Sequence, residues 1–362
     1  MNRFLQTAAC VMTHTIASRM RPSLQALLVV LVLGSWVGSA SADIWYIDNE
    51  NGQDTNSGRT ELVGPLAAGP FRTIRRALEA ANLGDTIVLA KNPTPYRETI
   101  TFSGAKNSGF PGQPFRLIGN GAVLSGTQQV LPKQWQFVRD GIYECRPADG
   151  AFQQLYLGSR PATFQAVTKD TLVDLEPLAW TLIEGRLYFR TEENVLPDAY
   201  DLHYAGGQTG ITLYLVHHVS IENLTVQGFW QDGINAHDNV RETKLVGVTA
   251  RGNGRSGISA GGSSRLDVVS SLVGDNWHQQ VRAEGVARIR LLGSNVLPNG
   301  NGATQLELDR GKILEEVPVV NTPIEGRLPI NPVRHARSDS VLERSLVPTR
   351  SSRLFDDATI YR

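Results

Sequence analysis

A repeat of about 23 residues in the second half of the chain constrains the fold more than any other feature. Four similar segments, GITLYL, GINAHD, GISAGG and QVRAEG, begin at residues 210, 233, 257 and 280, and QLELDR follows at 305. Each repeat alternates short apolar runs with Gly and Asn turns and has no helical pattern. Three short strands in a repeat of this length close one coil of a right-handed parallel β-helix, whose coils stack about 4.8 Å apart.

Asparagines keep nearly the same interval as the strand segments, at Asn253, Asn276 and Asn299. Identical positions of successive coils lie above one another in a β-helix, so these three side chains are expected to form a stacked ladder. Their amides can then bond from coil to coil at a turn. The ladder predicts that Asn276 is buried between its two neighbours.

Three N-terminal stretches carry a resemblance to a known superfamily: DIWYIDNENGQDTNSG, GPFRTIRRALEAANLGDTIVLA and PYRETITF. They resemble the entry module of secreted β-helix proteins of the pectate-lyase-like superfamily, in which an amphipathic helix covers the open end of the solenoid. The resemblance extends over 44–129 and 201–317 and identifies no specific enzyme family. Because that superfamily includes lyases, hydrolases, epimerases and non-enzymes, the resemblance implies the fold and leaves the activity open.

The helical pattern in the second of these stretches agrees with a cap. Phe71, Ile74, Leu78 and Ala81 share one helical face, and Gly84 is placed to end the helix. The predicted fold class is all-β: a right-handed parallel β-helix with an N-terminal amphipathic cap helix and a small antiparallel β insertion. Five parts are expected: a signal peptide at 1–42, the cap and first coils at 43–129, the insertion at 130–200, the repeats at 201–317 and a flexible tail at 318–362.

The first 42 residues have the pattern of an export signal. Arg19 and Arg21 precede an apolar run at 24–38, and Ala-Ser-Ala at 40–42 fits a cleavage site. Met20 is an alternative start. The protein is therefore expected to be secreted, periplasmic or extracellular, with an uncleaved anchor as the alternative. After cleavage no membrane span is expected, and Cys145 is the one cysteine of the mature chain.

Composition excludes some partners. The 362 residues carry a formal net charge of +0, so nothing in the charge balance favours nucleic acid. A monomer is expected. No metal site is assigned and no cofactor is certain. Calcium is left open because the loop at 48–58 is rich in oxygen ligands, although it lacks the EF-hand order and is better explained as a polar loop.

Strand alternation orients the candidate site residues. In the segment at 233–238, Ile234 and Ala236 are expected to point inward, and Asn235 and His237 outward. The same rule predicts one outward ladder of Thr212, Asn235, Ser259, Arg282 and Glu307, and a second of Tyr214, His237, Gly261, Glu284 and Asp309. Such a face is either a ligand groove or an ordinary solvated surface. Asp232 and Asp238 are assigned to turns.

A glycan is the expected partner of this face. Trp230 and Trp277 align two coils apart and can stack on sugar rings, unless they pack against the insertion or the tail. The substrate-binding candidates are Asn235, Trp230, Trp277, Arg255 and His278.

Two chemistries remain open on the groove. A lyase needs a base such as His237 or His278, with Arg282 and Arg255 neutralising a uronate. A glycosidase needs two carboxylates, for which Glu284 and Asp309 suit a retaining pair. The catalytic candidates are His237, Glu284 and Arg282. The sequence leaves open whether the protein is an enzyme. The alternative is a non-catalytic glycan-binding or structural surface protein.

Overall fold

A computed structural model describes residues 42–148, 151–298 and 305–316. The predicted signal peptide, apart from its last residue, and the predicted tail lie outside these residues, as does Asn299. The strands of the solenoid are β1 (Ile44–Ile47), β2 (Thr86–Leu89), β3 (Ile100–Ser103), β4 (Phe115–Ser125), β14 (Ile211–Tyr214), β15 (His217–Gln227), β16 (Asp232–His237), β17 (Arg241–Val246), β18 (Thr249–Arg251), β19 (Ser256–Ala260), β20 (Arg265–Val269), β21 (Leu272–Gly274), β22 (Gln279–Ala283), β23 (Arg288–Leu292), β24 (Asn295–Val296), β25 (Gln305–Glu307) and β26 (Lys312–Glu316).

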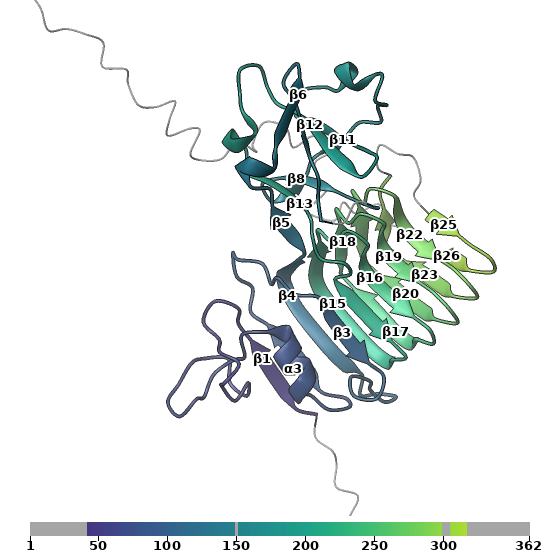
Figure 1. The fold of residues 1–362 in the computed structure, drawn as a ribbon. Coiled ribbons are helices and arrows are strands. Elements are labelled where there is room, and N and C mark those ends of the chain that lie inside the picture. The colour runs from purple at the N-terminus through teal and green to yellow at the C-terminus, as the bar shows by residue number, and fades with distance from the viewer. Residues whose placement is uncertain (1–41, 149–150, 299–304, 317–362) are drawn as a thin grey trace, which may run out of the picture. The chain divides into compact units, whose positions relative to one another are not determined.

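Strands of successive coils pair in parallel, as a β-helix requires. One sheet has the order β1-β2-β4-β15-β17-β20-β23-β26, and a second has the order β25-β22-β19-β16-β14-β3. The short strands β18, β21 and β24 pair along a third side. Figure 1 shows β16, β19, β22 and β25 side by side. The expected parallel β-helix with three strands per coil is confirmed.

Apolar side chains from all three sides of the coils fill one continuous core. The inward positions of β16 show the pattern, because Ile234 and Ala236 are both 0% exposed. At the turn before β19, Asn253 donates from Nδ2 to Oδ1 of Asn276 at 2.9 Å, and both residues are fully buried. The Asn253–Asn276 step of the predicted ladder is therefore confirmed.

The helix near the N-terminus, α3 (Ile74–Ala80), is short. The hydroxyl of Thr73 caps it by accepting from the backbone N–H of Arg76 at 3.2 Å. Leu78 is 6% exposed and belongs to the solenoid core cluster, so the expected apolar face is buried. The cap role of the helix stays a prediction. Within the described residues, no helix has the length and apolarity needed to cross a membrane.

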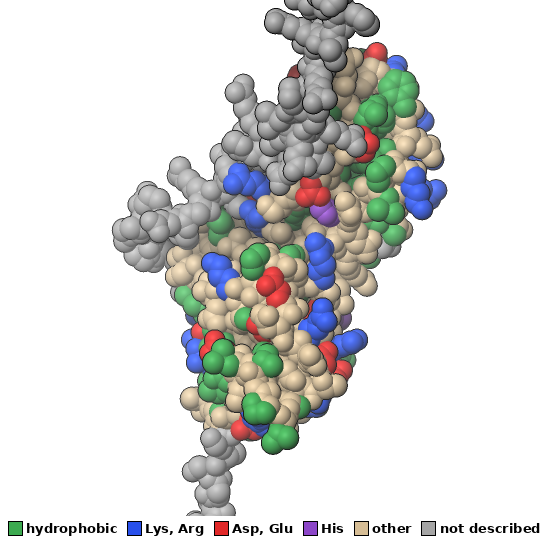
Figure 2. Space-filling model, turned by 90° about the vertical axis from the view of Figure 1, so that its left-hand side faces the viewer, with side chains coloured by type: hydrophobic (Ala, Val, Ile, Leu, Met, Phe, Trp, Pro, Cys, Tyr) green, Lys and Arg blue, Asp and Glu red, His purple; other side chains and the backbone are tan. Residues whose placement is uncertain are grey.

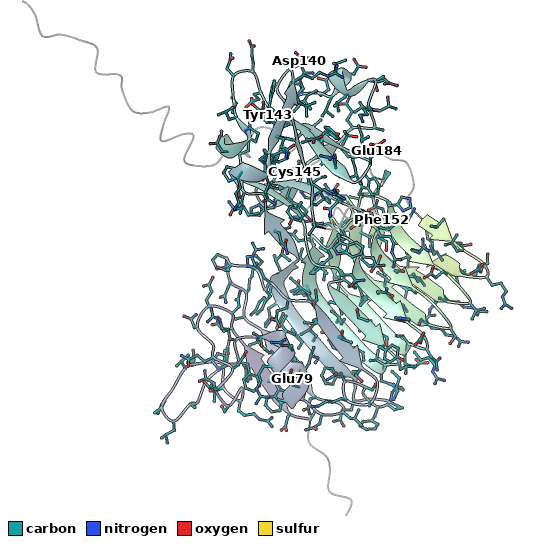
Figure 3. The ribbon with its side chains drawn as sticks, viewed as in Figure 1. Glu79, Asp140, Tyr143, Cys145, Phe152 and Glu184 are labelled. Atoms are coloured by element: carbon teal, nitrogen blue, oxygen red, sulfur yellow. The ribbon has the colours of Figure 1, made fainter. Side chains whose placement is uncertain are left out.

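A stretch of mainly antiparallel strands interrupts the coils. Its elements form two sheets, in the orders β10-β11-β12-β7-β6 and β5-β13-β8-β9. One apolar cluster contains residues of both sheets, and a second, smaller cluster contains residues of the first sheet. Figure 3 labels Cys145 within it and Phe152 beside the solenoid strands. The Tyr156 hydroxyl ties it to a solenoid coil by donating to the Gly252 carbonyl at 2.7 Å. The strands are β5 (Thr127–Gln129), β6 (Gln136–Arg139), β7 (Ile142–Cys145), β8 (Leu155–Leu157), β9 (Arg160–Pro161), β10 (Thr163–Phe164), β11 (Ala179–Ile183), β12 (Arg186–Arg190) and β13 (Leu202–Ala205).

Candidate functional site

A polar cavity of about 590 Å³ lies along the outer side of the sheet that contains β3, β14, β16, β19 and β22. Each coil contributes side chains from the same side, because inward and outward positions alternate along every strand. The lining residues are Thr99, Ile100, Thr101, Gln208, Thr209, Thr212, Gln231, Asn235, His237, Asp238, Arg255, Gly261, Gly262 and Glu284. The predicted outward face therefore contains a real hollow, and four of its predicted site residues line it.

The predicted ladders hold over four coils and fail at the fifth. Thr212, Asn235, Ser259 and Arg282 are in register from β14 to β22. The next partner of Arg282 is Leu306, not Glu307. Backbone hydrogen bonds set the register, and the one from Leu308 N to the Ala283 carbonyl places Leu308 where the sequence analysis expected Asp309. Asp309 does not line the cavity, so the proposed Glu284–Asp309 pair loses its geometric basis.

His237 and Asp238 form a pair at one side of the cavity. Nδ1 of His237 lies 3.1 Å from Oδ1 of Asp238, and their side chains are 54% and 45% exposed. The ring of Tyr214, one coil away, meets the His237 ring edge to face at a centroid distance of 5.7 Å. Asp238 adopts a left-handed backbone conformation, as the assigned turn role suggests, and it also lines the cavity.

Glu284 lies two coils from His237, with Gly261 between them. Its Oε2 accepts a hydrogen bond from Arg282 at 2.7 Å. A Cβ added at Gly261 would come within 3.4 Å of Oε1 of Glu284, so the missing side chain leaves space in front of this carboxylate. Arg282 does not line the cavity, and it reaches the site through Glu284.

A buried carboxylate lies beneath the cavity. Asp232 is 0% exposed and accepts two hydrogen bonds from Arg255, from Nε to Oδ1 at 3.0 Å and from a terminal nitrogen to Oδ2 at 2.5 Å. Ser256 donates to Oδ1 at 2.7 Å, and the amide of Asn235 donates to Oδ2 at 3.2 Å. Burial disfavours the charge of Arg255, but the hydrogen bonds to Asp232 raise the pKa of Arg255 overall. Asp232 thus fixes two residues that line the cavity.

The aromatic candidates lie outside the cavity lining. Trp277 packs on two aromatic residues of the insertion, Phe152 and Phe164, at centroid distances of 6.2 and 5.9 Å. The ring of His278 stacks on Trp277 at 5.8 Å. Burial and the nearby charge of Arg282 lower the pKa of His278. Trp230 is half-buried. The sugar-binding roles of these three residues stay predictions.

In the part of the chain that the structure describes, no three His, Cys, Asp or Glu side chains come together in a group that could hold a metal ion. In the loop considered for calcium, Asp48 uses Oδ1 to accept from the backbone N–H groups of Glu50 and Asn51 at 2.9 and 3.0 Å.

Some lining residues were not among the sequence-based site candidates. Asp238 was assigned to a turn alone. Gln208 and Gln231 were not selected as site residues, although they are 23 residues apart and Nε2 of Gln208 donates to Oε1 of Gln231 at 3.0 Å. That spacing was a usable signal. No such signal was available for Thr99 and Thr101. Their segment lies more than 100 residues before β14, with which β3 pairs, and it does not resemble the 23-residue repeat.

No family model and no curated protein matches this chain. Among solved structures, one described as a glycoside hydrolase has a TM-score of 0.51 at 11% identity, covering 76% of this chain and 78% of that chain. The complex structure of XylC with xylose has a TM-score of 0.38 at 12% identity, covering 75% and 70%. Pectate lyase Pel9A has a TM-score of 0.41 at 14% identity, covering 77% and 62%. The last two scores are too low to support an argument.

The first of these matches shows a shared fold at very low identity. The stacked parallel sheets place the chain in the class of parallel β-helix proteins, which is the fold expected from the resemblance noted in the sequence.

Proposed function

We propose that this protein is an exported glycoside hydrolase that cleaves a glycan bound in the outer-face cavity. The observation that carries the proposal is that two carboxylates, Asp238 and Glu284, line one polar cavity across the bare backbone of Gly261 and Gly262. Glycoside hydrolysis needs such a pair, one as general acid and one as base or nucleophile. The hydroxyl and amide groups of the lining suit sugar hydroxyls.

The spacing of the coils favours an inverting reaction. The backbone positions that carry the two carboxylates lie two coils apart, about 9.6 Å at about 4.8 Å per coil, which is nearer to the spacing of inverting than of retaining enzymes. Inverting enzymes hold their carboxyl groups about 6.5–9.5 Å apart, and retaining enzymes about 5–5.5 Å. The wider spacing leaves room for the water molecule that attacks the sugar in an inverting reaction. We assign Glu284 as the base that activates this water. A guanidinium hydrogen bond from Arg282 orients Glu284. The general acid is then Asp238, in contact with His237.

A uronate lyase is the second candidate. One observation favours it: His237 contacts a carboxylate that can orient it as a base. Against it, a lyase needs a cation to neutralise the uronate. Arg255 and Arg282, the cations expected for that role, are already paired with Asp232 and Glu284.

The test is a panel of neutral and uronate polysaccharides with the purified protein. We expect new reducing ends without an unsaturated product that absorbs in the ultraviolet. Glu284→Gln and Asp238→Asn should each lower kcat at least about 100-fold, since general acid–base catalysis contributes about 10²–10⁴. Glu242→Gln, which removes an exposed carboxylate outside the cavity, serves as the matched control.

Three other outcomes would overturn the hydrolase proposal. An unsaturated product that disappears in His237→Ala would mean a lyase. Retention of a polysaccharide without turnover would mean a binding protein, which is the alternative left open by the sequence. Full activity in both carboxylate variants would place the chemistry outside this cavity.

A further inference from the structure

One outward row of the solenoid carries a basic residue in four successive coils. Backbone hydrogen bonds set its register: Arg241 N to Val216 O, Arg265 N to Val240 O, Arg288 N to Ser264 O and Lys312 N to Ala287 O, at 2.7–3.0 Å. The step from β17 to β20 is irregular, because Thr243 pairs with Leu266 and both Arg241 and the exposed Glu242 therefore lie opposite Arg265. Each basic residue is the first of its strand, in β17, β20, β23 and β26. We call Arg241, Arg265, Arg288 and Lys312 the basic row. His217 precedes Arg241 in the same register.

The side chains of the basic row face solvent. All four residues are exposed, while the residues just before three of them, Val240, Ser264 and Ala287, are buried. Lys312 pairs with Glu307 at 3.0 Å. Within the described residues, no ion pair or side-chain hydrogen bond engages the guanidinium groups of Arg241, Arg265 and Arg288.

Fold stability does not account for this row. Like charges directly opposite each other on neighbouring strands are destabilising, and coils stacked at about 4.8 Å keep these cations close. The next outward row of the same sheet differs, because Arg290 makes two hydrogen bonds to Asp267. On the face shown in Figure 2, basic and acidic side chains are likewise interspersed. The three arginines of the row, which make no ion pair within the described residues, therefore have the property of a binding surface for repeated negative charges.

The basic row is a neighbour of the cavity both along the chain and around each coil of the solenoid. Arg241, Arg265 and Arg288 each come four residues after a cavity residue, namely His237, Gly261 and Glu284. One turn separates each pair of positions. The row thus follows the same three coils that form this part of the cavity, on the adjoining side of the solenoid.

We propose that the basic row binds an acidic polysaccharide, laid parallel to the direction in which the coils stack. A straight row that repeats once per coil matches a linear polymer whose anionic groups recur along its length. Arginine suits this ligand because its planar fork bonds carboxylate and sulfate oxygens in pairs. The chain has a net charge of +0, so the attraction is local to the row. The choice of a polysaccharide over another polyanion rests on the proposed function.

The test measures binding of the full chain to polygalacturonate over a series of salt concentrations, with dextran as the neutral polymer. The variant Arg241→Gln/Arg265→Gln/Arg288→Gln should raise Kd at least about tenfold. It should also lower the slope of log Kd against log salt by about 2, at about 0.7 per released counterion. A matched variant, Arg139→Gln/Arg146→Gln/Arg160→Gln, removes the same charge from exposed positions of the insertion and should bind like the parent.

The outcomes separate this inference from the proposed function. Equal losses in the two triple variants, or dextran bound as tightly as polygalacturonate, would overturn the basic row as a site. Duplex DNA that binds the row more tightly than polygalacturonate would overturn the polysaccharide assignment. Glu284→Gln should keep polygalacturonate binding, because it leaves the row intact. A chain without hydrolase activity whose binding still depends on the row would refute the proposed function alone. The triple variant of the basic row should keep the melting temperature of the parent, which would show that its weaker binding is not caused by unfolding.

Discussion

At the scale of single residues, Asp232 shows how a buried charge supports a polar surface. We expect Asp232→Asn to lower the free energy of unfolding by about 3 kcal/mol, because it leaves Arg255 without a counter-charge where its side chain is 16% exposed. Asp267→Asn is the matched control. Its partner Arg290 is 46% exposed, so the loss should be about 1 kcal/mol or less. Chemical denaturation measures both, and equal effects would contradict the structural role given to Asp232.

The burial of Cys145 leads to a second prediction at the scale of single residues. Burial, with a smaller effect from the charge of Glu144, raises the pKa of its thiol to about 12. A raised pKa means that the folded state keeps the proton while the unfolded thiol ionises near pH 8.5. Stability from this group is therefore present below about pH 8.5 and is lost as the pH rises toward 12. In a Cys10→Ser chain at pH 8, a thiol reagent should label Cys145 slowly until denaturant is added. Rapid labelling of the folded chain would show that the thiol is accessible.

At the scale of elements, the asparagine ladder joins one coil to the next. Oδ1 of Asn276 accepts from both the backbone N–H and the side-chain amide of Asn253, each at 2.9 Å. Asn276→Ala leaves these donors unpaired in a fully buried turn, so we expect a loss of about 1–3 kcal/mol. Thermal melting would measure it against Asn82→Ala at an exposed position. Melting temperatures that match would mean that the ladder does not hold the coils together.

At the scale of the whole molecule, Trp277 links the solenoid to the insertion. We expect Trp277→Ala to lower the free energy of unfolding by about 2 kcal/mol. This is less than the 3–5 typical of a fully buried aromatic residue, because Trp277 is half-buried. Phe137→Ala, at a residue 66% exposed in the insertion, should change it little. Unchanged stability in Trp277→Ala, together with weaker sugar retention, would instead support the sugar-binding role predicted from the sequence.

The repeat spacing and the alternation of apolar residues were enough to predict the coils, the inward positions of Ile234 and Ala236, and the outward face with Asn235, His237 and Glu284. These features are periodic, and a stacked coil repeats the same local pattern at every turn. The sequence could not place the last ladder, because the register of β25 depends on backbone hydrogen bonds between coils and not on the similarity of QLELDR to earlier segments. Nor could it show that Trp277 packs on the insertion, that Asp232 is buried under Arg255, or that Thr99 and Thr101 face the same cavity as Glu284. Those contacts join segments far apart in the chain, and the folded structure alone brings them together.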